Sequence, residues 1–233
     1  MILSNQGRSL LLRQTISEDA SILFNAYQDE SFSRLYRSNN TPPTQEQLTQ
    51  ILTERAKLSP IQLGYIEFMI IHKQYGPIGL AALGDYSPLH KRAEFLIGLF
   101  EEKHRSVGYG TEATLLVLDL AFNNYQLHKI YSYVYEYNEF AQKNMIKFGF
   151  KPEGILEEHH YVMREQRFVN LYLNGITEKH FRHSDKIRRY SLRLIGRDVT
   201  QPHQIIKLSS DNSLSVEVGK PFLNNWLTAI DDS

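Results

Sequence analysis

The 233-residue sequence predicts an α/β protein of the α+β kind, with helices on both faces of a mixed, mostly antiparallel sheet of about seven strands. Two observations carry this prediction. Three apolar runs between residues 64 and 100 are joined by short turns, which is typical of neighbouring antiparallel strands. A long apolar helix pattern then lies between two further strand patterns, and such a βαβ unit places its two strands parallel to each other.

The N-terminal part alternates strand and helix patterns before the antiparallel runs begin. Thr15 and Glu18 have the spacing of a capping box in front of one helical stripe, and Thr44 and Gln47 have it in front of another. Pro60 ends the second stripe. In chain order, the expected elements are a strand at 9–14, a helix at 20–27, an irregular segment at 29–40 and a helix at 48–56.

The central part follows from turn signals and periodicity. Tyr75-Gly76-Pro77 marks a turn between two strands, and Asn138 is placed to cap a helix that Gly149 ends. In chain order, the expected elements are strands at 64–72, 78–86 and 93–100, a helix at 111–124, a strand at 129–135, the helix between Asn138 and Gly149, and a hairpin of strands at 151–162 and 167–176.

The composition of the chain changes at about His183. Residues 186–197 are rich in arginine with few acids, a small hairpin is expected at 205–208 and 214–218, and an amphipathic helix is expected after Pro221. We therefore expect a main domain at 8–182 and a C-terminal extension at 183–233. The extension either packs on its own domain or docks a partner, an anionic surface or a second subunit, as in a homodimer.

Composition excludes several classes of function. The 26 basic and 26 acidic residues balance, which argues against nucleic acid or a membrane as partner. The absence of cysteine excludes thiolate chemistry, and His159 and His160 have no third metal ligand at a telling spacing, so no metal is expected. The N-terminus lacks a signal-peptide pattern and no apolar run is long enough to span a bilayer. We expect a soluble, cytoplasmic protein.

The segment 105–113 contains two glycines between a strand pattern and the long apolar helix pattern. Such a turn presents backbone N–H groups at the positive end of a helix dipole, where phosphate binds. Gly108-Tyr-Gly-Thr-Glu-Ala113 formally fits the dinucleotide pattern G-x-G-x-x-A, but it follows a polar connection and antiparallel strands. No Lys-Ser/Thr pair is present for a P-loop. The turn is therefore predicted to bind the phosphate of another kind of ligand.

Several motifs around this turn occur together and resemble one family. Arg105-x-x-Gly108-x-Gly110 has the spacing of an acetyl-coenzyme A motif, and the run 92–100 resembles the strand that precedes it. Val134-Tyr-Glu-Tyr-Asn138, with Phe-Gly-Phe-Lys-Pro-Glu-Gly at 148–154, resembles a second motif. Over about 9–181 the chain resembles the GCN5-related N-acetyltransferase (GNAT) family. Its closing hairpin resembles the branch of the ribosomal-protein-alanine and polyamine acetyltransferases.

The resemblance implies the GNAT fold, in which two central parallel strands splay apart, and acetyl-coenzyme A as cosubstrate. Backbone N–H groups of the glycine turn, with the charge of Arg105, would bind the pyrophosphate. Pantetheine would lie in the gap between the two strands. The coenzyme-binding residues that the resemblance implies are Ile97, Leu99, Arg105, Val107, Gly108, Tyr109, Gly110, Thr111 and Asn138. For Asn138, a plain helix cap is an equally good and compatible interpretation.

The catalytic groups are less clearly marked than the coenzyme turn. Glu94, on the strand before the turn, is the best candidate for a base, although a carboxylate that pairs with a surface lysine explains it as well. Many family members place a tyrosine acid seven residues after the asparagine, where this chain has Met145. Tyr137 is the alternative acid, or else this branch works without a dedicated one. His159 and His160 alternate along their strand, so one of them is a candidate to face the acceptor pocket, although a pair of surface histidines is the preferred interpretation.

Two functions compete at this point. The first is an N-acetyltransferase that moves an acetyl group from acetyl-coenzyme A to a primary amine by direct attack. The amine acceptor would be a peptide or small molecule: a protein N-terminus, a polyamine, an aminosugar or an aminoglycoside. The second is a catalytically weak or inactive module that binds acyl-coenzyme A for regulation or interaction, which Met145 and the unmatched extension would explain.

Overall fold

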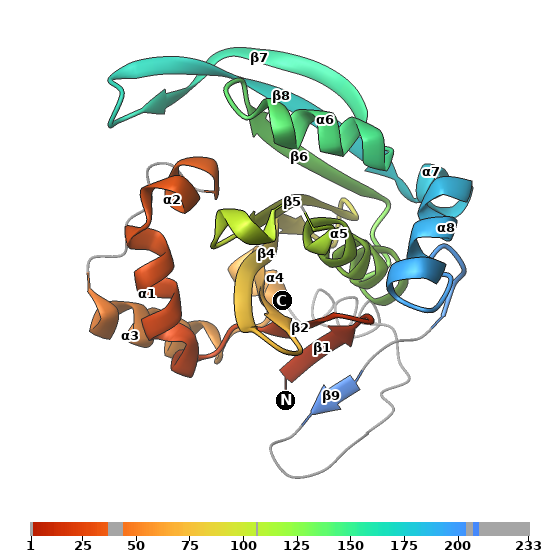
Figure 1. Ribbon diagram of the computed structural model, residues 1–233, viewed down its shortest axis with the longest axis horizontal. Coiled ribbons are helices and arrows are strands. Elements are labelled where there is room, and N and C mark those ends of the chain that lie inside the picture. Colours follow the sequence, from red (N-terminus) through yellow and green to blue (C-terminus); the bar gives the residue numbers. More distant parts are fainter. Residues whose placement is uncertain (1, 37–43, 106, 204–206, 210–233) are drawn as a thin grey trace, which may run out of the picture.

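The computed structural model describes residues 2–36, 44–105, 107–203 and 207–209, which contribute nine strands to one sheet (Figure 1). The strand order is β7-β8-β6-β5-β4-β3-β2-β1-β9, with only the β5–β6 pair parallel. The strands are β1 (Ile2–Gln6), β2 (Leu10–Gln14), β3 (Ile66–His72), β4 (Gly76–Ser87), β5 (Arg92–Leu99), β6 (Lys129–Tyr135), β7 (Lys151–Val162), β8 (Arg167–Thr177) and β9 (Lys207–Ser209). The predicted mixed, mostly antiparallel sheet is confirmed.

Helices cover both faces of this sheet, as predicted. They are α1 (Ala20–Gln28), α2 (Glu30–Tyr36), α3 (Gln45–Arg55), α4 (Pro60–Leu63), α5 (Tyr109–Asp119), α6 (Glu139–Phe148), α7 (Glu178–Arg182) and α8 (Asp185–Leu194). Figure 1 shows α1, α2 and α3 on one side of the molecule, with α5, α6 and α8 on the other. None of the helices in the described part of the chain combines the length and the apolar character needed to cross a bilayer.

Alternation along β5 sorts its side chains between two cores. Phe95 and Leu99 belong to the core under α5, while Leu96 packs against the second core, under α1 to α3. Gly98 lies on the α2 side, where a Cβ atom would come within 2.6 Å of the Phe32 ring. The glycine therefore lets α2 approach β5 closely.

The two parallel strands separate soon after they meet. β5 pairs with β6 only over Arg92–Lys129, Ala93–Ile130 and Glu94–Tyr131. Beyond Glu94, β5 continues to pair with β4 up to Leu99, while β6 continues to pair with β8 up to Tyr135. The splayed parallel pair expected from the family resemblance is therefore present, and the fork begins at Glu94.

The segment expected to be irregular at 29–40 is in part a helix, so that expectation was wrong for 30–36. The carboxylate of Asp29 accepts hydrogen bonds from the Phe32 backbone N–H at 2.9 Å and from the Ser31 hydroxyl at 2.7 Å, which starts α2. Phe32 and Tyr36 are then buried on its inner face. The Thr15–Glu18 capping box was also wrong, because the backbone N–H of Ile16 is bound by Asp19 instead.

The C-terminal part adds elements that the sequence analysis missed. The Ser184 hydroxyl accepts a hydrogen bond from the Ile187 backbone N–H and caps α8. Ile187 and Val199 are fully buried in the same core as α5, so residues 183–200 pack on the main domain. β9 pairs with β1. The expected second hairpin strand at 214–218 and the helix after Pro221 lie outside the described residues, and the division at 182 and 183 stays a prediction.

A buried carboxylate, Asp119 near the end of α5, ties the N-terminal and C-terminal parts together. It accepts hydrogen bonds from Asn5 on β1 at 3.1 Å, from Asn123 at 2.7 Å and from Arg197 at 2.7 Å. The oxygen that binds Asn123, Oδ1, also lies 3.2 Å from the His203 ring nitrogen Nε2. Burial opposes ionisation, but the interactions with His203, Asn123 and Arg197 outweigh it and lower the pKa of Asp119, while the carboxylate raises the pKa of His203.

Candidate active site

The glycine turn that precedes α5 is fixed by hydrogen bonds of its own backbone and by a side chain of the first turn of α5. Gly108 has φ +93°, in the left-handed region that favours glycine, and its carbonyl accepts hydrogen bonds from the backbone N–H groups of Thr111 and Glu112, both at 3.1 Å. The buried side chain of Glu112 accepts hydrogen bonds from the N–H groups of Ser9 and Leu10. The start of α5 is thereby fixed against β2, and its first-turn N–H groups lie at the helix terminus.

A cavity of about 590 Å³ runs from this turn into the fork of the sheet. Its walls come from β5, from the turn and first residues of α5, and from α2, α6 and α8. In Figure 1, α5, α6 and α8 lie on the same side of the molecule. The cavity therefore joins a helix N-terminus to the open edge of β5, two features that a long ligand with a phosphate group can use together.

Most of the predicted coenzyme residues line this cavity. These are Ile97, Leu99, Arg105, Val107, Gly108, Gly110, Thr111 and Asn138. Tyr109 is the exception, because its side chain points away into a group of rings with His72 at 4.8 Å and His104 at 6.0 Å between centroids. Only its backbone N–H is placed to contribute. The roles of all nine residues in binding stay predictions.

Arg105 and Asn138 both line the cavity, one from the segment before α5 and the other from the start of α6. The Arg105 guanidinium is within 3.4 Å of the Leu99 carbonyl oxygen, so its charge lies beside the end of β5. The Asn138 side-chain oxygen accepts a hydrogen bond from the Ala141 backbone N–H at 3.1 Å and caps α6. Asn138 also lines the cavity, so the structural and ligand-binding roles expected for it are compatible.

The two glycines of the turn leave room that packing alone does not require. A Cβ atom built on Gly108 or on Gly110 would meet no other atom within 4 Å, and both residues line the cavity. Gly108 needs to be glycine for its positive φ, but Gly110 lies inside the first turn of α5, where alanine is a better helix former. A glycine there is explained by a ligand that must approach the backbone closely, and coenzyme A pyrophosphate fits that description.

Replacing Gly110 by alanine is expected to separate stability from binding. The variant Gly110→Ala should be as stable as the wild type or gain up to about 1 kcal/mol, because alanine favours the helix. Its affinity for coenzyme A should fall at least about tenfold, because the added methyl group occupies space beside the first-turn N–H groups. Urea denaturation and titration calorimetry measure the two effects. Unchanged affinity together with raised stability would contradict a phosphate site at this turn.

Glu94 lies at the fork, on the face of the sheet opposite to α5. Its strand neighbours Ala93 and Phe95 are buried in the core under α5, and Glu94 itself is in register with Tyr131 of β6. The Tyr131 hydroxyl donates a hydrogen bond to Asp85, which also pairs with Arg92 at 3.0 Å. A carboxylate and a tyrosine thus face the side of the fork that is away from the glycine turn.

Tyr137, the predicted alternative acid, is already engaged. Its hydroxyl donates a hydrogen bond to the Arg34 carbonyl oxygen on α2 at 3.0 Å, and the Arg34 guanidinium lies 4.4 Å from its ring centroid. Desolvation by burial, together with the electrostatic interaction with the neighbouring Tyr135, raises the pKa of Tyr137 to about 12. The side chain is not part of the cavity wall. Met145 does line the cavity and is buried in the core, as its apolar character indicates.

The two adjacent histidines do not alternate as expected. The register of β7 and β8 shifts between Leu156 and His160, and Glu158 has φ +47°. As a result, His159 contacts Tyr133 and His160 contacts Tyr135, although both tyrosines point to one face of β6. Desolvation, together with the neighbouring His159, lowers the pKa of His160. Both rings therefore lie over the same row of tyrosines.

Several wall residues were missed by sequence reasoning because they lie on elements that it did not predict. Phe32 and Leu35 reach the cavity from α2, and Tyr190, Arg193 and Leu194 reach it from α8. The signals were present: Asp29 and Ser184 are good N-cap residues in front of stretches with helical spacing.

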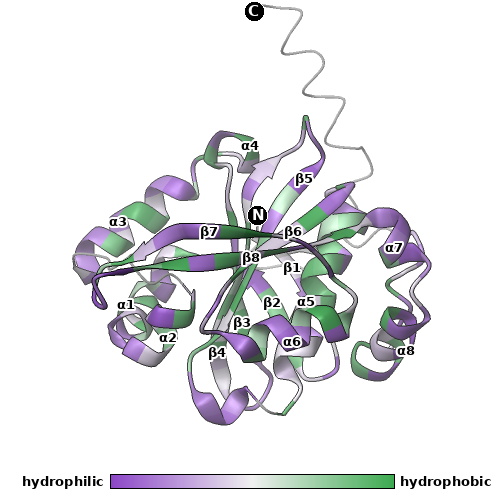
Figure 2. Ribbon diagram, turned by 90° about the horizontal axis from the view of Figure 1, so that it is seen from above, coloured by the Kyte–Doolittle hydropathy of each residue, from purple (hydrophilic) through white to green (hydrophobic). Residues whose placement is uncertain are grey.

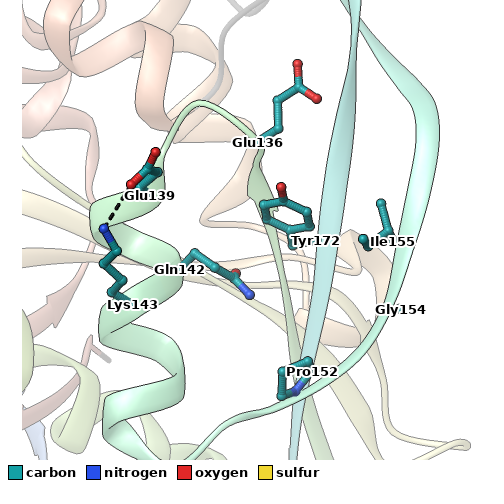
Figure 3. A pocket seen from close by; sticks show the side chains of 8 residues that line it. All are labelled: Glu136, Glu139, Gln142, Lys143, Pro152, Gly154, Ile155 and Tyr172. Atoms are coloured by element: carbon teal, nitrogen blue, oxygen red, sulfur yellow. Dashed lines mark hydrogen bonds and ion pairs between the residues drawn. The ribbon is translucent and has the colours of Figure 1, made fainter.

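A second groove, of about 530 Å³, lies on the other side of α6, between that helix and the β7–β8 hairpin (Figure 3). It has two carboxylates, but both are paired. Glu139 binds Lys143 at 2.8 Å, and Glu136 binds Arg167 at 2.9 Å. None of the predicted site residues lines this groove. Because both carboxylates of this groove are neutralised by ion pairs within the protein, we assign the groove no catalytic role.

Comparison with known proteins supports the interpretation of the cavity. Residues 9–151 match the family described as the acetyltransferase (GNAT) domain. The uncharacterized N-acetyltransferase YoaA of Bacillus subtilis is 28% identical over 166 residues, which cover 70% of this chain and 91% of that protein. Spermidine N(1)-acetyltransferase of Escherichia coli K12 is 33% identical over 89 residues, covering 38% of this chain and 47% of that protein.

Solved structures share the fold. A spermidine N-acetyltransferase from Vibrio cholerae, crystallised with CoA and spermine, superposes with a TM-score of 0.66 at 23% identity, covering 74% of this chain and 97% of that chain. A ribosomal-protein-S5-alanine acetyltransferase from Vibrio fischeri gives 0.65 at 18% identity, covering 75% and 96%. The family match spans more than half of the sequence, so the chain belongs to the GNAT acetyltransferases, enzymes that use acetyl-coenzyme A as acetyl donor.

Proposed function

We propose that this protein transfers an acetyl group from acetyl-coenzyme A to a primary amine by direct attack of the amine on the thioester. One observation supports this most strongly: a single cavity connects the N-terminus of α5 with the fork between β5 and β6, where Glu94 lies on the opposite face. A cosubstrate bound along the cavity would present its thioester at the fork. The amine would then approach from the face that carries Glu94 and Tyr131.

Binding would be divided along the cavity. Backbone N–H groups from Val107 to Thr111, with Arg105, would hold the pyrophosphate. The backbone of Ile97 and Leu99 would hydrogen-bond the pantetheine amides, because this edge of β5 is not paired with β6 in the described structure. The side chain of Asn138, at the start of α6, would also hydrogen-bond the pantetheine amides. Such contacts align the thioester and exclude water from the fork.

The chemistry requires one proton acceptor and a route for the leaving group. A primary amine is protonated at neutral pH and must lose a proton before it can attack. Glu94 would accept that proton, directly or through water. The nitrogen of the neutral amine then forms a bond to the acetyl carbon, the carbon–sulfur bond breaks, and coenzyme A leaves as the thiolate. The nitrogen releases its second proton to water as it becomes the amide. Since no acid replaces the tyrosine at Met145, solvent would protonate this thiolate.

The proposed acceptor is an amine whose cationic group and apolar carbon chain can pack against aromatic rings. The row of Tyr131, Tyr133 and Tyr135 on β6 offers ring faces that attract cations. Two of the relatives are named for spermidine, so a polyamine is the first acceptor to test. Protein N-termini, aminosugars and aminoglycosides follow. The expected homodimer stays a prediction.

A binding and turnover experiment tests this function. Acetyl-coenzyme A at about one hundred times its dissociation constant should stabilise the protein by about 2.7 kcal/mol, because it binds only the folded state. Release of free coenzyme A thiol should then depend on the added amine. Absence of stabilisation would overturn the proposal. Stabilisation with no turnover on polyamines, peptides, aminosugars or aminoglycosides would instead favour the inactive coenzyme-binding module.

A further inference from the structure

The outer wall of the coenzyme cavity contains side chains for which the proposed function has given no role. Tyr190, Arg193 and Leu194 line the cavity from α8, and Lys147 lines it from the last turn of α6. The family match ends at residue 151, well before α8 begins at Asp185. The α8 part of this wall, with Tyr190, Arg193 and Leu194, therefore lies beyond the matched family domain, whereas Lys147 lies within it.

α8 is firmly packed on the main domain. Ile187 is fully buried in the core, and the Leu194 carbonyl oxygen accepts a hydrogen bond from the Arg8 backbone N–H at 3.1 Å. The buried Ser191 hydroxyl donates a hydrogen bond to the Arg188 carbonyl oxygen and accepts one from the Val199 N–H. These contacts hold α8 in a fixed position beside the cavity.

The charges on this wall are not balanced within the described structure. The exposed side chains of Arg193 and Lys147 form no ion pair with any described carboxylate, whereas Arg188, on the same helix, pairs with Asp198 at 3.3 Å. The Arg193 guanidinium lies 5.3 Å from the centroid of the half-buried Tyr190 ring. Two cations and an aromatic ring in the wall of one cavity are suited to a phosphorylated nucleoside.

We propose that α8 and α6 form a subsite for the 3′-phosphoadenosine part of coenzyme A. Arg193 and Lys147 bind the ribose 3′-phosphate, and Tyr190 packs against the adenine. The inference rests on the proposed function, which assigns the pyrophosphate to the turn before α5. Coenzyme A has one other phosphate, on the ribose. Arg193 and Lys147 line the same cavity from elements other than the turn, so they are the cations proposed to bind that phosphate.

The test compares coenzyme A with 3′-dephospho-coenzyme A, which differs only in this phosphate. In titration calorimetry with the full-length chain, coenzyme A should bind at least about tenfold more tightly, the effect of one charge-assisted hydrogen bond. Arg193→Ala should weaken coenzyme A binding by about tenfold and leave the affinity for the dephospho ligand unchanged. Lys147→Ala should do the same. The discrimination should shrink in high salt.

Arg189→Ala is the matched control, because Arg189 is an arginine of the same helix that does not line the cavity. It should change neither affinity. Equal affinities of the wild type for the two ligands would overturn the subsite but not the proposed function. An equal loss for both ligands in Arg193→Ala would also overturn it, since that result indicates damage to the wall. Failure of the wild type to bind either ligand would overturn the proposed function itself.

Discussion

The variant Glu94→Gln is expected to lower kcat by about 10²-fold or more, the usual contribution of a general base. Glutamine keeps the size and the polar contacts of the side chain but cannot accept a proton from the attacking amine. KM for acetyl-coenzyme A should change little, because Glu94 is not part of the cavity wall. Steady-state kinetics at neutral pH measure both parameters on the acceptor that gives turnover.

The pH profile adds a readout that a merely structural role would not change. Activity of Glu94→Gln should recover in part at high pH, where more of the amine is already neutral. Asp85→Asn is the matched control. Asp85 shares the neighbourhood of Tyr131 but is held by that hydroxyl and by Arg92, and asparagine tolerates its φ of +42°. A loss in Asp85→Asn as large as that in Glu94→Gln would argue against Glu94 as the base.

The glycine turn before α5 and its place in a cavity wall could be predicted because the signal is local. Arg105, Gly108 and Gly110 lie within six residues of each other, and the physical requirement, bare backbone at the start of a helix, is met by those residues alone. The strand order around them follows from equally local patterns of alternation and turns. The splayed pair was inferred only from the family resemblance, since separation of two strands leaves no periodic trace in either one.

The rest of the site depends on distant contacts. The sequence of α8 was interpreted only as a basic stretch, because arginines dominate it. Its inner stripe consists of only four residues: Ile187, Tyr190, Ser191 and Leu194. α2 was obscured by its polar residues for the same reason. Hydropathy coloured on the ribbon shows both helices as alternating polar and apolar bands rather than uniform segments (Figure 2). Which cavity such a stripe adjoins is decided by tertiary packing.

The irregularity in β7 is a second feature that the sequence pattern did not predict, because it interrupts the period-two alternation of the strand. Period-two alternation predicts that His159 and His160 face opposite sides. Between Leu156 and His160, however, β7 has two residues more than the facing stretch of β8, and this irregularity overturns the prediction. Asn170 contributes to this arrangement, because its side-chain oxygen accepts the Glu158 backbone N–H at 2.8 Å. No pattern in the sequence of one strand could indicate a bond that comes from its neighbour.

Replacing Asp119 by alanine should cost about 3 kcal/mol of folding free energy, because the change breaks a buried, charged network. The carboxylate has no exposed surface, and its loss would leave Arg197 without its acid and His203 without the group that raises its pKa. Urea denaturation at an unchanged m-value measures this loss. Glu54→Ala, which breaks the exposed Glu54–Lys57 pair, is the control and should cost less than about 1 kcal/mol.

The same variant also tests how stability is linked to the proposed coenzyme subsite. Asp119 joins β1 to the segment after α8 through Arg197, so its loss should loosen the wall that carries Tyr190 and Arg193. Affinity for coenzyme A and for the dephospho ligand should then fall together, unlike the selective effect of Arg193→Ala. A loss of stability no greater than that of Glu54→Ala would show that Asn5, Asn123 and Arg197 compensate for one another through their remaining partners.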